Sequence, residues 1–283
     1  MGVRAADLAG SWYPATESEC LKVFEKFEKA SISSRGIEWT GGIVPHAGWV
    51  FSGQVAYDVI KHLKGTTDSP DTIIIFGRHL HPGSGNYIMN EGSWDTPLGE
   101  LDIASDIADK IITEFRFSVE TWSIYATDNT VEVQLPFIRY LFPGARILPV
   151  GVPPAPQSIR IGERIAEIAL ELGHKIKVLG STDLTHYGPN YDNTAMGTGQ
   201  RALDWVKNHN DRKMVDLMLK MEPQAVIEES LRDMNACCGG AVSAAIASVK
   251  KLGAVESREV IYTTSYDVMP GSSFVGYAGV VFR

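Results

Sequence analysis

Residues that could bind a metal ion or move protons gather in a few short segments of this chain. Four of the seven histidines fall in three of them: His46 in segment 45–48, His79 and His81 in segment 77–81, and His186 in segment 181–186. Neutral imidazole is a common metal ligand and exchanges protons near neutral pH. A single loop histidine is more often a surface residue than a ligand, so the prediction rests on the three segments taken together.

The third segment also carries an acid. Asp183 and His186 are three residues apart, which would place both side chains on one face of a helical turn. A carboxylate beside an imidazole fixes its tautomer and raises its basicity. This spacing predicts His186 as a general base oriented by Asp183. The alternative is a carboxylate that caps a helix beside an incidental histidine.

Two adjacent cysteines precede a predicted helix of small residues. A thiol at a helix N-terminus feels the positive end of the helix dipole, which favours the thiolate, and a thiolate is a metal ligand or a nucleophile. Cys238 is therefore a candidate ligand, and Cys237 a weaker one. The alternative is ordinary packing of small buried cysteines, which is the expectation for Cys20 on an early amphipathic helix.

Two histidines with one anionic residue, leaving coordination positions open, form the usual plan of a non-heme iron site that handles oxygen. Zinc hydrolases use similar ligand sets around an activated water. The ligand types alone do not separate these two chemistries.

Each histidine-bearing segment follows a predicted strand, at about 42–45, 72–76 and 175–179. The run Thr72-Ile73-Ile74-Ile75-Phe76 is rich in β-branched residues and typical of a strand buried on both faces. Ligands in open α/β sheets bind in the crevice at the carboxyl ends of the strands. The three segments are therefore expected to meet at one rim of the sheet and form a metal-capable pocket.

The remaining pattern alternates helices and strands. Thr16 and Glu19 form a capping box for a helix at about 16–30. Further helices are expected near 53–64, 103–115, 131–141, 161–172 and 238–251, with helical segments after 195 that break at 222–223. Strands are expected at 146–150, 259–266 and 273–282. These elements predict a single α/β domain over residues 1–283, with a mostly parallel or mixed central sheet flanked by helices.

Composition excludes several other classes. The 283 residues are 44% hydrophobic and 21% charged, which is typical of a folded globular protein. A net charge of −8 makes nucleic acid and anionic membranes poor partners. No apolar run approaches a membrane span. Three cysteines, two of them adjacent, favour a reducing compartment, so a cytoplasmic protein is expected. A small-molecule substrate or a peptide ligand is the expected partner, and an oligomer is compatible with the sequence.

Several motifs in this order resemble the Memo protein family, whose fold is similar to that of class III extradiol ring-cleaving dioxygenases. The resemblance covers nearly the whole chain. Its motifs are Ala-Gly-Ser-Trp-Tyr-Pro at 9–14, Val-Pro-His-Ala-Gly-Trp at 44–49, Val-Glu-Val-Gln-Leu-Pro at 131–136, Ser-Thr-Asp-Leu-Thr-His-Tyr-Gly at 181–188 and Asn-Ala-Cys-Cys-Gly at 235–239.

The resemblance implies a metal site made of His46, a histidine near 79–81, and Cys238. The family's second metal histidine usually lies in Gly-Pro-x-His, a motif this chain lacks. His81-Pro82-Gly83 fits the family spacing better, so His81 is favoured and His79 is the alternative. The family usually carries a histidine where this chain has Asn129.

The same resemblance implies iron or copper binding and a dioxygenase-like pocket. Iron is the first expectation, with copper and zinc as alternatives. The expected function is that of a non-heme iron redox enzyme acting on a small, aromatic substrate. The alternatives are a zinc hydrolase on the same scaffold and a non-catalytic module that binds a ligand or peptide. His186 and Asp183 would move protons. The expected pocket residues are Trp49, Tyr187, Asn129, Glu132 and Gln134.

Overall fold

The apolar run at 72–76 forms the centre of the main sheet. In the computed structural model, which describes residues 2–31, 36–65 and 69–283, this run belongs to β3 (Thr72–Gly77). Ile73 and Ile75 join the core on one face of the sheet, whereas Ile74 and Phe76 join the core on the other face. Because both faces are covered, every residue of this strand is buried, as the run predicts.

The main sheet is mixed, with a parallel centre. Its hydrogen-bonded order in the described residues is β10-β12-β2-β9-β3-β8-β4-β7, and β11 also pairs with β12. Strands β2, β9, β3 and β8 run parallel to one another. Strands β12 and β4 run antiparallel to their neighbours β2 and β8, one on each side of this centre. The expected α/β fold with a mixed sheet is confirmed.

The strands of this sheet have the following bounds: β2 (Gly41–Val44), β4 (Asn86–Met89), β7 (Phe117–Glu120), β8 (Arg146–Gly151), β9 (Ile176–Ser181), β10 (His186–Tyr187), β11 (Ser257–Thr264) and β12 (Phe274–Phe282). A separate small sheet contains β1 (Val3–Arg4), β5 (Ser93–Trp94) and β6 (Leu101–Asp102). The strands β1, β4, β5, β6, β7 and β10 were not predicted, because they have four residues or fewer and little alternation.

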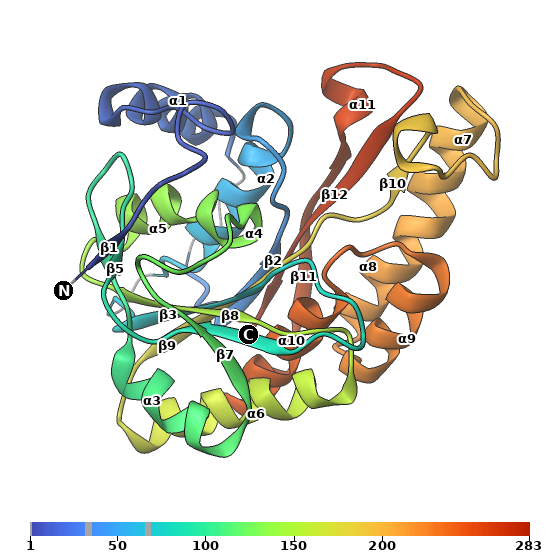
Figure 1. Cartoon of the computed structure of the whole chain (residues 1–283). Coiled ribbons are helices and arrows are strands. Elements are labelled where there is room, and N and C mark those ends of the chain that lie inside the picture. The colour runs from blue at the N-terminus through green and yellow to red at the C-terminus, as the bar shows by residue number, and fades with distance from the viewer. Residues whose placement is uncertain (1, 32–35, 66–68) are drawn as a thin grey trace.

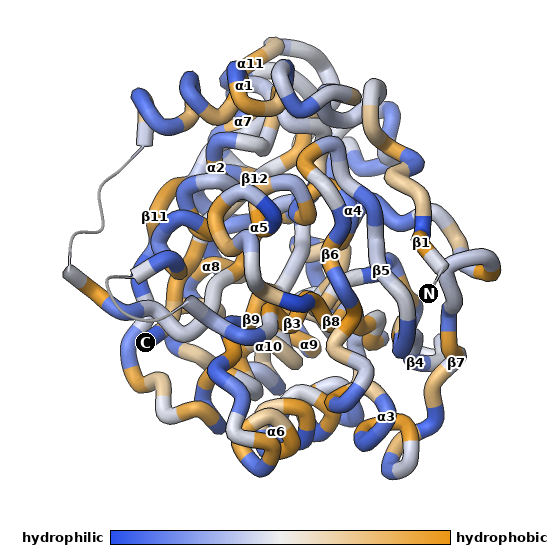
Figure 2. The backbone as a smooth tube through the Cα atoms, turned by 90° about the vertical axis from the view of Figure 1, so that its left-hand side faces the viewer, coloured by the Kyte–Doolittle hydropathy of each residue, from blue (hydrophilic) through white to orange (hydrophobic). Residues whose placement is uncertain are grey.

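Helices cover both faces of the sheet (Figure 1). On one face lie α1 (Glu17–Ala30), α2 (Trp49–His62), α4 (Asn129–Glu132) and α5 (Leu135–Leu141). The other face is covered by α3 (Ser105–Glu114), α6 (Pro156–Glu171) and α10 (Gly239–Lys251). In Figure 2, α3 and α6 alternate between hydrophobic and hydrophilic residues, as expected of helices with one buried face.

The remaining helices pack beside α10 and β11–β12. They are η1 (Pro189–Tyr191), α7 (Gln200–Trp205), the π-helical turn η2 (Val206–Asn210), α8 (Asp211–Leu219), α9 (Pro223–Asp233) and α11 (Ser265–Val268). The expected break near Glu222-Pro223 separates α8 from α9. No helix in the described part of the chain is long and apolar enough to cross a membrane.

Half of the predicted capping box forms at the start of α1: Thr16 is the N-cap, but the Glu19 carboxylate contacts the Thr16 hydroxyl rather than its backbone amide. The Thr16 hydroxyl accepts a hydrogen bond from the backbone amide of Glu19, and it also lies 2.7 Å from the Glu19 carboxylate. A side-chain oxygen at this position satisfies an amide that has no partner within the helix. The helix presents Cys20 and Phe24 to the core, so the expectation that Cys20 is a core residue is confirmed.

Candidate metal site

Three loops meet at one rim of the sheet because the strands before them are neighbours. β2 pairs with β9, and β9 pairs with β3, all in parallel, so their carboxyl ends lie side by side. The loops that follow carry His46, His79 and Asp183. His46 and His79 are 33 residues apart in the chain, yet their Nε2 atoms lie 3.1 Å from each other. The expected convergence of these loops is observed.

A fourth loop, between α9 and α10, brings the two cysteines to the same rim. The backbone amide of Cys237 donates to the carbonyl oxygen of Asp183 over 3.1 Å, and the amide of Cys238 donates to the Thr182 hydroxyl over 3.1 Å. These hydrogen bonds fix the cysteine loop to the loop that follows β9. The Cys237 sulfur consequently lies 3.3 Å from the Nε2 atom of His46.

His46, His79, Cys237 and Cys238 form the metal-capable cluster. Each offers one ligand atom, and all four atoms lie within 4.8 Å of one another. A tetrahedral shell with bonds of about 2.0–2.3 Å separates neighbouring ligand atoms by about 3.3–3.8 Å. Three of the separations here are 3.1 Å between the imidazoles, 3.3 Å from the His46 imidazole to the Cys237 sulfur and 3.8 Å between the two sulfurs. The donor set therefore fits a transition-metal ion.

His46 is held in an orientation that suits a ligand. Its ring is buried, and its Nδ1 atom lies 2.9 Å from the Ser181 hydroxyl. When Nδ1 carries the proton and donates it to Ser181, Nε2 presents a lone pair to the cluster. Such a partner on the far nitrogen is the usual way in which proteins orient a metal-binding histidine.

The choice between the two neighbouring histidines is made by the backbone at Arg78. Arg78 has a φ of 75°, and its amide donates to the Thr130 hydroxyl over 2.7 Å. Its guanidinium pairs with Glu120 and lies over the Tyr87 ring. The chain turned in this way directs His79 to the cluster.

His81, which the family spacing favours, has a different place. Its backbone amide donates to the Ser84 hydroxyl and its carbonyl accepts from the Ser84 amide, so it begins a surface turn. The side chain is exposed and is not part of the four-residue cluster. His79, the alternative, lies beside His46, whereas the favoured His81 lies outside the cluster.

Asp183 contacts His46 rather than orienting His186. One carboxylate oxygen accepts from the backbone amide of His46 over 2.8 Å, and the other lies 4.0 Å from its Nε2 atom. The Nδ1 atom of His186 instead lies 3.2 Å from the carbonyl oxygen of Leu184. No helical turn forms at these residues, because His186 belongs to β10, so the expected shared helical face is absent from this described segment.

Charges within the cluster shift the acidity of its members. Burial alone would lower the pKa of His46, but the negative charges of Asp183 and Cys237 outweigh burial and raise that pKa to about 9. Burial opposes ionisation of Cys237, yet the Cys238 thiol and the charge of His46 hold its pKa well below the usual range. Burial, followed by the neighbouring Cys237, raises the pKa of Cys238. The electrostatics therefore favour Cys237 as the thiolate.

Cys237 was expected to be a weaker candidate than Cys238, and the family motif also points to the second cysteine. The adjacent pair itself was the signal for both. Ser181 holds the His46 ring and Thr182 holds the Cys238 backbone. In the sequence these two residues appear only as polar members of the loop motif, with no sign of these contacts.

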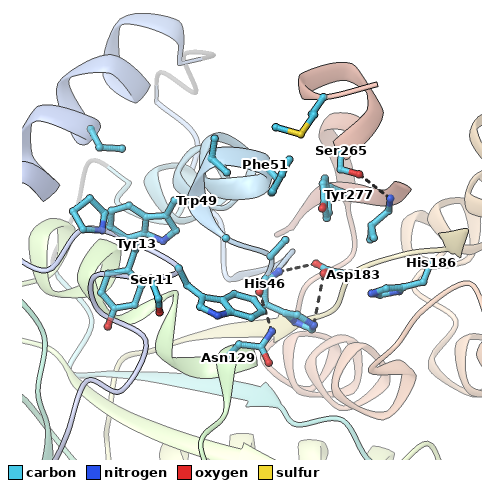
Figure 3. A pocket seen from close by; sticks show the side chains of 18 of the residues that line it. Ser11, Tyr13, His46, Trp49, Phe51, Asn129, Asp183, His186, Ser265 and Tyr277 are labelled. Carbon is cyan, nitrogen blue, oxygen red and sulfur yellow. Dashed lines mark hydrogen bonds and ion pairs between the residues drawn. The ribbon is translucent and has the colours of Figure 1, made fainter. Parts of the chain in front are cut away.

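A large cavity opens onto the cluster (Figure 3). Its volume is about 1120 Å³, and His46, His79, Asn129, Asp183 and His186 line its polar end. A smaller cavity of about 300 Å³ is lined by His81, His186 and Cys237 among others. Since His186 lines both cavities, it lies between them and is accessible from each.

The five expected pocket residues divide into two groups. Trp49 and Asn129 line the large cavity, where the Asn129 amide donates to the His46 carbonyl oxygen over 3.0 Å. Tyr187, Glu132 and Gln134 are buried and are not among its described lining residues.

Those three residues make supporting contacts instead. Gln134 donates to the Pro45 carbonyl oxygen over 2.7 Å, beside His46. Glu132 accepts a hydrogen bond from the Tyr13 hydroxyl over 2.9 Å, and Tyr13 itself lines the large cavity. Tyr187 donates to the Gly197 carbonyl oxygen and stacks on Phe274.

The fold and the cluster define an α/β protein with a mixed sheet and a candidate metal site at its carboxyl rim. A solved structure with a similar fold is that of an uncharacterized protein from Escherichia coli K12, at a TM-score of 0.54 and 10% identity over 86% of this chain and 99% of that one. At this identity the likeness concerns the fold alone.

The family model described as Memo-like protein matches residues 4–281, so the chain belongs to the Memo family. Similar relatives include MEMO1 family proteins of Methanopyrus kandleri, 32% identical over 99% of both chains, and of Thermococcus onnurineus, 33% identical over 99% of both. The family resemblance that the motifs indicated is confirmed.

Proposed function

We propose that this protein binds a redox-active metal ion, with iron as the first expectation, and performs dioxygenase-like chemistry on a small organic substrate that carries an aromatic group. The observation that carries the proposal is the cluster of two imidazole nitrogens and two sulfurs within 4.8 Å, next to a cavity large enough for an organic ligand. His46, His79 and a thiolate from the cysteine pair would hold the ion.

A bound iron ion with open coordination positions would supply the oxygen chemistry. The residues around the ion would position its ligands and exchange protons with the substrate. Ser181 orients the His46 ring, and Asp183 holds the His46 backbone while keeping a negative charge beside it. His186 faces the cavity with Nδ1 toward the Leu184 carbonyl oxygen, so its other nitrogen is available to accept a proton from a substrate.

Thiolate ligands affect the choice of metal. A thiolate is softer than the carboxylate of ring-cleaving dioxygenases and favours copper or zinc more strongly. Two imidazoles with two thiolates also match a ligand set that zinc takes in proteins. This donor set supports the second candidate, a zinc-type hydrolase on the same scaffold.

Metal analysis after anaerobic purification tests the site. Wild type should contain close to one equivalent of metal, and His46→Ala should lose most of it. An unchanged metal content in the variant would count against the site. A protein that is metal-free in both forms but binds a small molecule or peptide would favour the third candidate, a non-catalytic binding module.

Two assays on the loaded protein then separate the chemistries. Oxygen consumption with catechol-like compounds by the iron-loaded form supports the dioxygenase proposal. Ester or amide hydrolysis by the zinc-loaded form, with no oxygen uptake by the iron-loaded form, favours the hydrolase.

A further inference from the structure

We infer that the large cavity takes an amphipathic organic anion whose apolar body is larger than a single aromatic ring. Its polar head would face the cluster, its body would lie between two apolar walls, and its negative charge would pair with Lys26. This inference rests on the proposed function, because it assigns the chemical class of ligand to the same site.

The size of the cavity sets the size of the ligand. Ligand pockets of about 300–1,000 Å³ bury most of a drug-sized molecule, and this cavity is about 1120 Å³. A single-ring compound would leave most of that space filled with water against apolar side chains. A ligand with two or more rings, or a chain of similar bulk, matches the volume.

The walls of the cavity are apolar and lie on opposite sides of the polar end. One wall contains Tyr13 of the N-terminal loop and Trp49 of α2 (Figure 3). Tyr277 of β12 lies on the other side (Figure 3), where Phe51 of α2 packs against the cluster of Val275 and Tyr277. Met269 also lines the cavity. Burying an apolar body between these walls is favourable by about 25 cal/mol per Å² of apolar surface removed from water.

The rim of the cavity is also apolar and open to solvent. The exposed fractions are 71% for Val50, 65% for Met269 and 38% for Trp12, and all three side chains line the cavity. Exposed apolar side chains that line a cavity are placed to contact a ligand that occupies it. A ligand body that reaches the rim would cover it.

Lys26 supplies the charge. It is exposed on α1, lines the cavity beside Phe27, and has no carboxylate partner in the described residues. The acid among the lining residues, Asp183, is buried at the opposite, polar end and lies beside His46. Lys26 is therefore the one lining side chain at the mouth that carries a fixed charge among those the structure describes, and it attracts an anion.

A matched pair of fluorescent probes tests the inference. Anilinonaphthalene sulfonate carries an anionic group on two aromatic systems, and N-phenylnaphthylamine has the same skeleton without the charge. Both should bind the full chain. Lys26→Met keeps the aliphatic stem and should weaken binding of the sulfonate about two- to fivefold while leaving the neutral probe unchanged. Lys22→Met, one turn earlier on α1 and outside the cavity lining, is the control and should change neither.

A second variant locates the body of the ligand. Phe51→Ala removes a half-buried wall side chain and should weaken both probes about fivefold or more. Equal sulfonate binding by wild type and Lys26→Met, or unchanged binding of both probes by Phe51→Ala, overturns the inference.

Metal content measured on the same samples keeps the two proposals apart. If the protein contains no metal but the variants change probe binding as expected, this inference stands and the metal proposal fails. If the protein holds its metal but the variants do not change probe binding, the metal proposal stands and this inference fails.

Discussion

Asp183 accepts a hydrogen bond from the backbone amide of His46 over 2.8 Å, and its second oxygen lies 4.0 Å from the His46 ring. The acid thus hydrogen-bonds to the buried histidine of the cluster rather than to His186. It ties the loop after β9 to the loop after β2 and supplies part of the negative charge that the His46 ring experiences.

Replacing that charge should change the acidity of His46. In the metal-free protein, Asp183→Asn keeps an oxygen that can accept from the His46 amide but removes the carboxylate charge. The pKa of His46 should fall from about 9 toward its ordinary 6.5. Titration of the histidine ring resonances by NMR measures this change. His62, which is buried elsewhere with Nδ1 2.7 Å from the Asp58 carbonyl oxygen, is the internal control. A His46 resonance that titrates alike in both proteins would show that Asp183 does not control it.

The two adjacent cysteines should differ in reactivity. The pKa of Cys237 is held low and its side chain is partly exposed beside the smaller cavity, whereas Cys238 and Cys20 are buried and have raised pKa values. Iodoacetamide attacks the thiolate, so at neutral pH the metal-free protein should be labelled first at Cys237. Peptide mass spectrometry after short exposures reads out the order. Earlier labelling of Cys238 or Cys20 would be inconsistent with this assignment.

A buried carboxyl behind the site should make stability depend on pH. Asp211 accepts hydrogen bonds from the backbone and hydroxyl of Thr185 and from the Tyr262 hydroxyl, yet burial raises its pKa from 3.8 to about 6. The folded state therefore holds this proton more tightly than the unfolded chain does. Its contribution to stability is present below pH 4 and is lost as the pH rises through 6.

Asp211→Asn isolates that contribution. Between pH 4 and pH 7 the wild type should lose about 2 kcal/mol of unfolding free energy relative to the variant, at about 1.4 kcal/mol per pKa unit. Urea denaturation of both proteins across this range measures the difference. A difference that stays constant with pH would mean that Asp211 does not change its protonation in this window.

Close packing at the start of α10, directly after the cysteine loop, should make this helix turn intolerant of added bulk. A Cβ atom at Gly240 would collide with the Pro153 backbone carbonyl, so Gly240→Ala should cost about 1–3 kcal/mol of stability. Gly83→Ala is the control, because its Cβ would meet nothing within 4 Å. Equal unfolding free energies for the two variants would argue against tight packing at Gly240.

The sequence predicted the parts of the site that depend on strand order. Loops that follow parallel strands had to meet at one rim, so His46, the 79–81 pair and Asp183 could be placed together from the pattern alone. The choice of His79 could not be predicted, because it depends on the left-handed backbone of Arg78 and on contacts of Arg78 with Thr130 and Glu120, which are distant in sequence.

Other features were hidden for the same physical reason. The contact of Asp183 with His46 joins residues 137 positions apart, and no local pattern reports it. The short strands β4 and β7 at one end of the main sheet lacked a periodic signal. His62 near the end of α2 is buried, because the C-terminal strands β11 and β12 pack against this helix.

Metal content of two neighbouring histidine variants tests the central geometry most directly. Wild type, His79→Ala and His81→Ala are purified without oxygen, loaded with one equivalent of iron, freed of unbound ion and analysed for metal. We expect His79→Ala to lose most of the metal and His81→Ala to keep the wild-type amount. Retention by His79→Ala together with loss by His81→Ala would contradict this expectation.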